Sequence, residues 1–206
     1  TSDYSHILTD IDIVLHVAAR AHVMDEESDN PLEEYRNINT LATLNLAKQA
    51  ANNGIKRFIF ISSIKVLGEK TKLGRPFTID DRLNPQDPYA VSKAEAEIGL
   101  QDLAEKSNME VVIIRPPLIY GNGVKGNFAK LLKLAPLQIP LPLGSIKNQR
   151  SLVGVENLVD LIHTCLEHPK AKNEIFLVSD DHDMSTPELL ELISVSGGFK
   201  SRLFKF

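Results

Sequence analysis

Short runs of apolar residues alternate along the chain with longer stretches whose apolar positions recur every three or four residues. The short runs are typical of buried strands and the longer stretches of amphipathic helices. We expect strands at 12–18, 57–62, 110–115, 151–155 and 174–178, and helices at 31–53, 89–106, 127–134, 156–167 and 187–195. Strands that alternate with helices in this order predict an α/β fold with a parallel sheet. The run at 12–18 is apolar almost throughout, which predicts a strand buried on both faces.

The ends of the predicted helix at 31–53 carry recognisable signals. Asn30 is a good N-cap residue, and Pro31 suits the first helical position. Gly54 is a typical residue at a helix end. Residues 118–145, by contrast, contain four glycines and three prolines around one short predicted helix. We therefore expect this segment to lie outside the sheet.

Composition narrows the classes of function. The 206 residues suffice for a domain with its own core, without disulfides or metal ions to stabilise it. The 23 basic and 27 acidic side chains give a net charge of −4, and no block of lysine and arginine is present to bind nucleic acid. The lone cysteine, Cys165, excludes an intrachain disulfide and a cysteine-based zinc site, which favours a reducing, cytoplasmic location. No apolar run is long enough to cross a membrane. The acidic segment 180–183 lacks the spacing of a calcium loop, so we expect a solvated loop and no metal site.

Tyr89 and Lys93 form the first candidate for chemistry. They stand four residues apart at the start of a predicted helix, so they share one helix face. Free tyrosine has a pKa of about 10 and is a poor base at neutral pH, but a nearby ammonium favours the phenolate and lowers that pKa. The pair is therefore a candidate acid and base for a hydroxyl or carbonyl group. A half-buried tyrosine beside a surface lysine explains the same spacing without chemistry.

Ser62 and Ser63 lie at the end of the predicted strand at 57–62. In a parallel sheet the carboxyl ends of the strands share one edge, where ligands bind. A hydroxyl at this edge can hydrogen-bond the substrate oxygen on which Tyr89 works, although a simple turn also accounts for two serines here.

Six segments taken in order resemble the extended short-chain dehydrogenase/reductases, the NAD-dependent epimerase/dehydratase family. They are residues 14–20; Asn39 with Thr43 and Leu44; Ser62 and Ser63 with Val66 and Gly68; Tyr89 with Lys93; Arg115 and Pro116 with Tyr120 and Gly121; and residues 150–153 with Asn157 and Asp160. The resemblance covers nearly the whole chain and implies a Rossmann-like doubly wound parallel sheet. The family opens with a strand, a Gly-x-x-Gly-x-x-Gly turn and a helix that approach the cofactor pyrophosphate, and this chain lacks that segment and the family's final one. We therefore expect a sheet without its first strands, in a chain truncated at the N-terminus and the C-terminus.

The resemblance also predicts how the chain is divided. Residues 1–116 would form a partial NAD(P)-binding Rossmann-like domain, and residues 117–149 part of a small substrate-binding region. Residues 150–206 would return to the sheet and begin a C-terminal region.

Roles for individual residues follow from the same resemblance. The implied catalytic residues are Ser63, Tyr89 and Lys93. The implied cofactor-binding residues are Val17, Ala18, Ala19, Asn39, Ile61, Ser62, Tyr89, Lys93 and Pro116. The implied substrate-binding residues are Ser63, Lys65, Leu118, Asn127 and Arg150. NAD is the implied cofactor, with NADP left open, a UDP-sugar is the implied substrate, and the helices at 31–53 and 89–106 would form a homodimer.

Within the family, segments 62–66, 86–89 and 140–144 resemble bacterial UDP-N-acetylglucosamine/UDP-glucose 4-epimerases and related UDP-sugar dehydrogenases of surface polysaccharide synthesis. The implied reaction is an NAD(P)-dependent 4-epimerisation of a UDP-hexose or UDP-N-acetylhexosamine, in which Tyr89 exchanges the proton of the C4 hydroxyl during hydride transfer. Ile64 and Lys65 replace the Asp-Glu pair of nucleotide-sugar 4,6-dehydratases, which argues against water elimination. Two alternatives stay open. One is a UDP-sugar dehydrogenase or reductase of the same family, and the other is a non-catalytic truncated remnant, suggested by the missing phosphate-binding turn.

Overall fold

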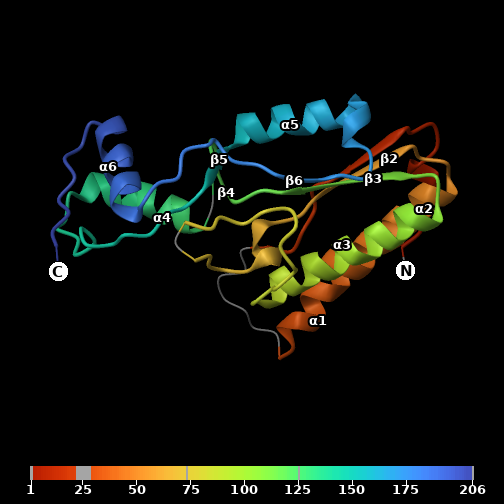
Figure 1. Ribbon diagram of the computed structural model, residues 1–206, viewed down its shortest axis with the longest axis horizontal. Helices are drawn as coiled ribbons and strands as arrows, with labels where there is room; N and C mark the ends of the chain where they lie inside the picture. Colours follow the sequence, from red (N-terminus) through yellow and green to blue (C-terminus); the bar gives the residue numbers. More distant parts are fainter. Residues whose placement is uncertain (1, 22–28, 73, 125, 206) are drawn as a thin grey trace. The chain divides into compact units, whose positions relative to one another are not determined.

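The computed structural model (Figure 1) describes residues 2–21, 29–72, 74–124 and 126–205, without the side chain of Asn127. The chain divides into two units. The first consists of residues 1–116 and 159–178, and the second of residues 117–158 and 179–206. Each unit is described in turn.

A parallel sheet forms the centre of the first unit. Within the described residues it has four strands, which are, in sheet order, β1 (Ile13–His16), β2 (Arg57–Ile61), β3 (Glu110–Arg115) and β6 (Ile175–Leu177). The register aligns the carboxyl ends of the strands, since His16 lies opposite Phe60 and Ile61 opposite Ile114. The predicted α/β fold with a parallel, Rossmann-like sheet is therefore confirmed.

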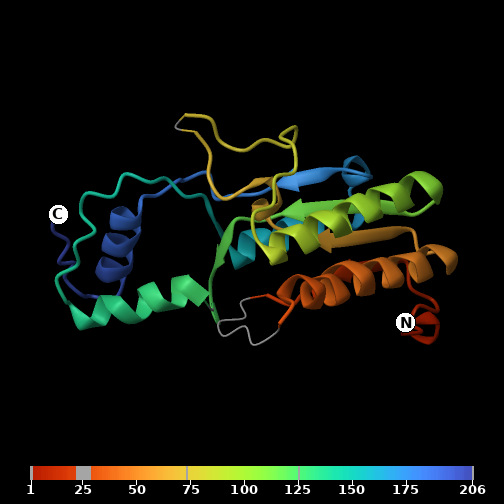
Figure 2. The same cartoon turned by 90° about the horizontal axis from the view of Figure 1, so that it is seen from below.

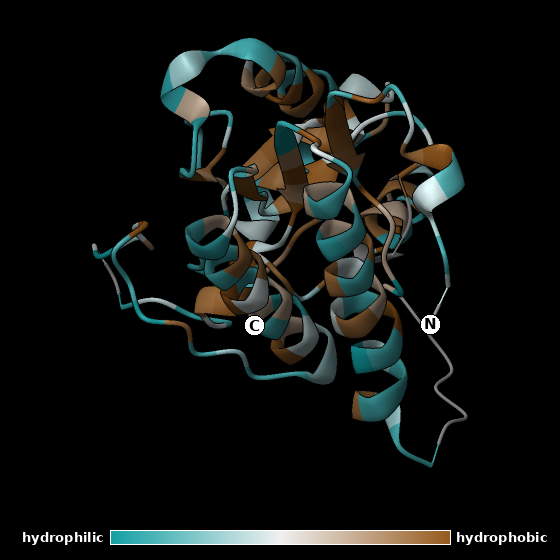
Figure 3. Cartoon of the chain, turned by 90° about the vertical axis from the view of Figure 1, so that its right-hand side faces the viewer, coloured by the Kyte–Doolittle hydropathy of each residue, from teal (hydrophilic) through white to brown (hydrophobic). Residues whose placement is uncertain are grey.

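Helices cover both faces of this sheet (Figures 1 and 2). One face carries a continuous helix made of α1 (Pro31–Tyr35), a π-helical segment η2 (Arg36–Leu41) and α2 (Ala42–Asn52), together with α3 (Pro88–Lys106). The opposite face carries α5 (Val155–Glu167). Between the helices the strands are strongly hydrophobic (Figure 3), and the core beneath α2 and α3 includes Phe58, Phe60, Leu100, Ile113 and Ala47. The shorter turns of this unit are η1 (Ser5–Ile7), η3 (Ile64–Leu67) and η5 (Pro169–Ala171).

The helix boundaries follow the signals in the sequence. The Asn30 side chain accepts a hydrogen bond from the Glu33 amide, Pro31 opens α1, and Gly54 takes a positive φ of 77° just beyond α2. Only glycine adopts that backbone conformation without strain. Asp87 caps α3 by accepting a hydrogen bond from the Ala90 amide at 2.7 Å. This cap fixes where the helix with Tyr89 in its first turn begins.

Burial corrects the expectation for the first strand, and on the helix at 31–52 it does not follow the large apolar residues. Strand β1 was expected to be buried on both faces, but Leu15 is 41% exposed and Val17, just beyond it, 63%. The reason is that β1 is an outer strand, paired in the described part of the chain with β2 alone. On the helix at 31–52, the apolar Ile38 and Leu41 face outward, while the small or polar Asn39, Thr43, Ala47 and Ala50 pack inward. Small side chains let this helix approach the sheet and α3 closely.

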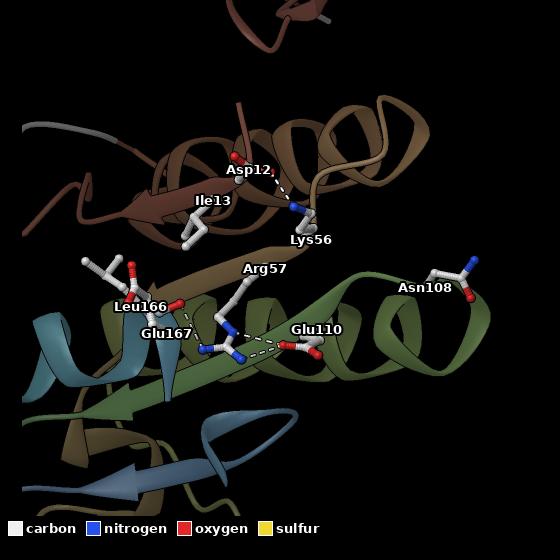
Figure 4. Close-up of a pocket in the computed structure, with 8 residues that line it drawn as sticks. All are labelled: Asp12, Ile13, Lys56, Arg57, Asn108, Glu110, Leu166 and Glu167. Atoms are coloured by element: carbon white, nitrogen blue, oxygen red, sulfur yellow. Dashed lines mark hydrogen bonds and ion pairs between the residues drawn. The ribbon is translucent and has the colours of Figure 1, made fainter. Parts of the chain in front are cut away.

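Arg57 joins the sheet to α5 at the end of the sheet where the strands begin (Figure 4). Its Nε and Nη2 donate to the Glu110 carboxylate at 2.9 and 2.6 Å, and its Nη1 donates to the carbonyls of Cys165 at 2.6 Å and Leu166 at 2.9 Å. A guanidinium at the last turn of a helix satisfies carbonyls that have no partner within the helix. The hollow of about 480 Å³ beside it, which Figure 4 shows, therefore lies over a structural ion pair whose donors are directed at the protein.

The second unit contains a small parallel pair of strands, β4 (Leu118–Tyr120) and β5 (Leu152–Gly154). Its helical segments are α4 (Gly126–Leu134), η4 (Ala135–Leu137) and α6 (Thr186–Ser196), and its core centres on Phe128, Leu152 and Leu189. The strand expected at 151–155 thus pairs with β4, which the sequence pattern did not predict. Of the segment 150–206, expected to return to the main sheet, only β6 adds a strand there, while residues 179–206 belong to the second unit.

None of the helices in the described ranges is both long enough and apolar enough to span a membrane.

Candidate active site

The carboxyl edge of the main sheet brings Ser63, Tyr89 and Lys93 together. Ser63 follows β2 and is the N-cap of η3, and Tyr89 stands in the first turn of α3. Lys93 lies one turn further along α3, on the face that packs against β2. The Ser63 side chain acts on the Tyr89 phenol and lowers its pKa. Ser63 and the later Tyr89–Lys93 pair therefore share one position at the edge where parallel sheets bind ligands.

Lys93 is almost completely buried, with 1% of its surface exposed. Its Nζ donates to the Ile61 carbonyl at 2.8 Å and lies 4.4 Å from the centre of the Phe60 ring. Burial disfavours the ammonium and lowers the pKa of Lys93 to about 8, against the opposing charge of Glu97. The carbonyl and the aromatic face hold the charged group in one place.

The phenol of Tyr89 is held in its protonated form. Burial raises its pKa to about 12, the hydrogen bond with Ser63 acts in the opposite direction, and the charges of Asp87 and Tyr35 raise it further. The Tyr35 ring meets the Tyr89 ring edge-on at 6.2 Å. The expectation that Lys93 lowers the Tyr89 pKa is wrong for this structure, because the Lys93 ammonium is directed to the Ile61 carbonyl.

Asn39 connects the segment after β1 to α3. It is fully buried, and its Oδ1 accepts from the Arg20 amide at 2.8 Å. Its Nδ2 donates to the Arg20 carbonyl at 3.1 Å and to the Ser92 hydroxyl at 3.0 Å. Ser92 in turn donates to the Tyr89 carbonyl at 2.7 Å. Asn39 lies in the π-helical segment η2, an irregularity often found at functional sites.

Two buried polar atoms at the same sheet edge have no partner among the described residues: the Ser62 hydroxyl and His16 Nδ1. Ser62 follows β2 and His16 ends β1, and the two strands are neighbours. An unpartnered buried hydroxyl is costly unless a ligand or water completes it. Val17, Ala18 and Ala19 are exposed immediately after β1, on the same edge.

Pro116 and Lys65 are held by contacts within the first unit. The Pro116 carbonyl accepts from the Ile64 amide at 3.0 Å, which fixes the turn that follows Ser63. The Lys65 ammonium pairs with Asp87 at 2.5 Å. Lys65, predicted to bind substrate, therefore already has a protein partner.

Comparison with known proteins identifies the chain. The model of the NAD dependent epimerase/dehydratase family matches residues 2–179. The chain belongs to this family. That result confirms the resemblance drawn from the six sequence segments.

The relatives of the chain include two 4-epimerases. The chain is 55% identical over 197 residues to a UDP-glucose 4-epimerase of Vibrio cholerae, an alignment that covers 95% of this chain and 60% of that protein. It is 30% identical over 172 residues to an N-acetyl-alpha-D-glucosaminyl-diphospho-ditrans,octacis-undecaprenol 4-epimerase of Escherichia coli O157:H7, covering 81% of this chain and 50% of the other. The chain thus spans 60% or less of the length of these two relatives.

A solved structure shares the fold. The UDP-glucuronic acid 4-epimerase of Bacillus cereus, in complex with UDP-glucuronic acid and NAD, superposes with a TM-score of 0.84 at 23% identity. The match covers 100% of this chain and 65% of that one. The likeness confirms the family fold.

The remaining predicted substrate residues belong to the second unit. Leu118 opens β4, and the Arg150 backbone pairs with Met184 through two hydrogen bonds of 2.9 and 3.0 Å. The Asn127 side chain lies outside the described part of the structure.

Two carboxylates that bind side chains distant in the sequence were not predicted from the sequence. Glu97 is fully buried and binds the Arg115 guanidinium through Nε and Nη2, the shortest contact being 2.7 Å. Its position four residues after Lys93 on a helix was a usable signal. Asp180, expected in a solvated loop, instead accepts hydrogen bonds at 2.7 Å from both the Tyr120 hydroxyl and the Asn157 amide. No local pattern marks Asp180, because its partners lie 60 and 23 residues away.

Proposed function

We propose that the protein containing this chain is an NAD(P)-dependent 4-epimerase of a UDP-hexose or a UDP-N-acetylhexosamine. The observation that carries the proposal is the Ser63–Tyr89 contact, with buried Lys93 one helical turn away, at the carboxyl edge of the sheet. The 55% identity to a UDP-glucose 4-epimerase supports the same reaction.

In the proposed reaction, Tyr89 takes the proton of the sugar C4 hydroxyl and Ser63 hydrogen-bonds the same oxygen. The nicotinamide, when bound, supplies the hydride acceptor and donor at C4 and a positive charge that favours the Tyr89 phenolate. Loss of hydride and proton leaves a 4-keto sugar. After the keto sugar turns its other face, hydride returns to C4 and Tyr89 returns the proton to the oxygen, so C4 is inverted with no net oxidation.

The chain's own residues fit a dinucleotide at this edge. The unpartnered Ser62 hydroxyl follows β2, and the exposed residues Val17, Ala18 and Ala19 follow β1 at the same edge. An ammonium has three N–H donors, and the Lys93 contact with the Ile61 carbonyl uses one. We propose that Lys93 donates to a ribose hydroxyl, that Asn39 holds the end of the β1 segment, and that Ile61 and Pro116 line the nicotinamide. NAD is the proposed cofactor, as in the Bacillus cereus relative.

Product analysis tests the activity. The full-length protein is incubated with UDP-N-acetylglucosamine or UDP-glucose and catalytic NAD, and the products are followed by proton NMR. We expect inversion at C4 and no accumulation of reduced cofactor. A parallel calorimetric titration measures the binding of NAD and of NADP.

Each alternative gives its own result. Stoichiometric reduction of the cofactor with an oxidised sugar would identify a dehydrogenase and overturn epimerisation. An absence of dinucleotide binding by the full-length protein would indicate a non-catalytic remnant.

We also propose that the protein forms a homodimer through the helices at 31–53 and 89–106. Ile38 and Leu41 on η2 and Ile98 on α3 are 44%, 58% and 51% exposed, although all three are large and apolar. The η2 segment packs against α3 in the first unit, so the exposed side chains lie on adjacent helices. Covering them with a second copy would remove apolar surface from water.

A charge at this surface should separate the subunits. We expect Leu41→Asp combined with Ile98→Asp to convert a dimer to a monomer, as measured by light scattering coupled to size-exclusion chromatography. Val195→Asp in α6, which is 71% exposed, is the matched control and should leave the dimer intact. A wild-type protein that is monomeric at micromolar concentration would overturn the proposed dimer.

A further inference from the structure

A closed ring of contacts surrounds the Ser63–Tyr89 pair. The Ser63 hydroxyl accepts from the Lys65 amide at 3.3 Å, and the Lys65 ammonium pairs with Asp87 Oδ2 at 2.5 Å. Asp87 Oδ1 accepts from the Ala90 amide at 2.7 Å and so caps α3, which has Tyr89 in its first turn. The interaction of the Ser63 side chain with the Tyr89 phenol completes the ring.

Lys65 is the link that joins the two halves of this ring. Ser63 and Lys65 belong to η3, and Asp87 and Tyr89 to the start of α3, 22 residues later in the sequence. Both sides of the ion pair are partly shielded, with 49% of the Lys65 side chain and 28% of the Asp87 side chain exposed. The pair therefore holds the turn carrying Ser63 against the helix turn carrying Tyr89.

The ion pair also controls a charge beside the reacting phenol. The Asp87 carboxylate disfavours the Tyr89 phenolate by repulsion. A lysine ammonium on the other oxygen of that carboxylate offsets part of this repulsion. The Lys65 side chain thus affects both the position of Ser63 relative to Tyr89 and the charge that acts on the Tyr89 phenol.

We propose that Lys65 is a positioning residue of the 4-epimerase: its ion pair with Asp87 holds Ser63 in register with Tyr89 and offsets part of the Asp87 charge that acts on the phenol. This rests on the proposed function. It replaces the expectation that Lys65 binds the sugar, and it concerns a residue that acts through Asp87 and Ser63.

Several described groups face Tyr89, and the experiment must separate Lys65 from them. Asp87 at the N-cap of α3, Ser63 at the N-cap of η3 and the Tyr35 phenol of α1 act on Tyr89. The Lys93 ammonium is directed to the Ile61 carbonyl, and the Lys65 ammonium pairs with Asp87. Of the charged groups among them, Asp87 and Lys65 are the two in direct contact with each other. Removing the Lys65 charge and removing the Asp87 charge should therefore shift the pKa of Tyr89 in opposite directions.

The test compares Lys65→Met and Asp87→Asn in the full-length protein by the pH dependence of kcat/KM. Activity rises as Tyr89 loses its proton, so this limb reports the Tyr89 pKa in the enzyme before the sugar binds. We expect Lys65→Met to move the limb about 0.5 pH unit upward, because the Asp87 charge is left unpaired. We expect Asp87→Asn to move it about 0.5 pH unit downward, because asparagine keeps the helix cap and removes the charge. Lys65→Met should also lower kcat about tenfold through the loss of alignment.

Controls separate the positioning role from simple loss of stability. Lys65→Arg restores the charge and should return the limb to the wild-type pH. Lys56→Met breaks an exposed ion pair with Asp12 at the opposite edge of the sheet and should leave the profile unchanged. The proposal would be overturned if Lys65→Met and Asp87→Asn moved the limb in the same direction, or if neither variant moved it.

A second readout does not depend on the proposed activity. The chain contains four tyrosines and no tryptophan, so tyrosinate formation is visible in the ultraviolet spectrum. Subtraction of a Tyr89→Phe titration isolates Tyr89, whose ionisation should occur at lower pH in Asp87→Asn and at higher pH in Lys65→Met than in the wild type. An inactive wild-type protein would overturn the proposed function alone, whereas an unchanged Tyr89 titration would overturn the role of Lys65.

Discussion

Replacing Tyr89 with phenylalanine is expected to lower kcat for C4 inversion about 10³-fold, with the KM for the UDP-sugar changed less than about threefold. The substitution removes the hydroxyl that exchanges a proton with O4 and keeps the ring that packs against Tyr35. Its effect therefore falls on the transition state, where the proton moves, more than on ground-state binding. Steady-state kinetics with the full-length protein measure both constants.

Tyr35→Phe is the matched control for this experiment. It makes the same chemical change in the ring that lies 6.2 Å away from Tyr89, outside the contact with Ser63. We expect less than about a threefold change in kcat for this variant, because Tyr35 affects Tyr89 only through a weak repulsion. A Tyr89→Phe protein that keeps a tenth or more of the wild-type kcat would remove Tyr89 from the chemistry.

The second large effect concerns stability. Glu97→Gln should lower the free energy of unfolding by about 3–5 kcal/mol, because it leaves the Arg115 charge buried without its counter-ion. The two side chains are 0% and 4% exposed, and their shortest contact is 2.7 Å. Arg115 Nη1 has no partner among the described residues, so this guanidinium depends heavily on Glu97. Urea unfolding of the full-length protein measures the difference.

Glu95→Gln on the same helix provides the comparison. Glu95 binds Arg36 at 2.5 Å, but the two side chains are 33% and 45% exposed, so we expect a loss below about 1 kcal/mol. A double variant, Glu97→Leu with Arg115→Met, should recover much of the stability because no buried charge remains. Equal losses of unfolding free energy for Glu95→Gln and Glu97→Gln would show that burial does not determine how much these ion pairs stabilise the fold.

Local sequence determined most element boundaries. Asn30, Pro31 and Gly54 place one helix, and Asp87 with Pro88 places the start of α3, because caps and glycine act through hydrogen bonds and φ values within a few residues. Strand β4 escaped prediction because three residues carry too little periodicity to distinguish a strand from a loop.

The site residues could also be identified from short sequence segments. The spacing of Tyr89 and Lys93, and the two serines after β2, can be read directly from the sequence. The pKa values of these side chains, by contrast, could not be predicted from the local sequence. Tyr89 was expected to be acidified by Lys93, yet burial raises its pKa to about 12, and the Lys93 ammonium is turned to the Ile61 carbonyl. Burial and side-chain direction depend on which elements pack together, and a single segment does not contain that information.

The sequence by itself determined the family, the alternation of strands and helices, and which residues stand at the carboxyl edge of the sheet. Each of these depends on periodicity, on caps or on short motifs, which are encoded within a few residues of one another. The tertiary structure alone decided that Glu97 neutralises Arg115, that Asn39 joins Arg20 to Ser92, and that Lys65 pairs with Asp87. Those contacts span 18 to 53 residues, and they form because parallel strand pairing and helix packing bring distant segments to one edge.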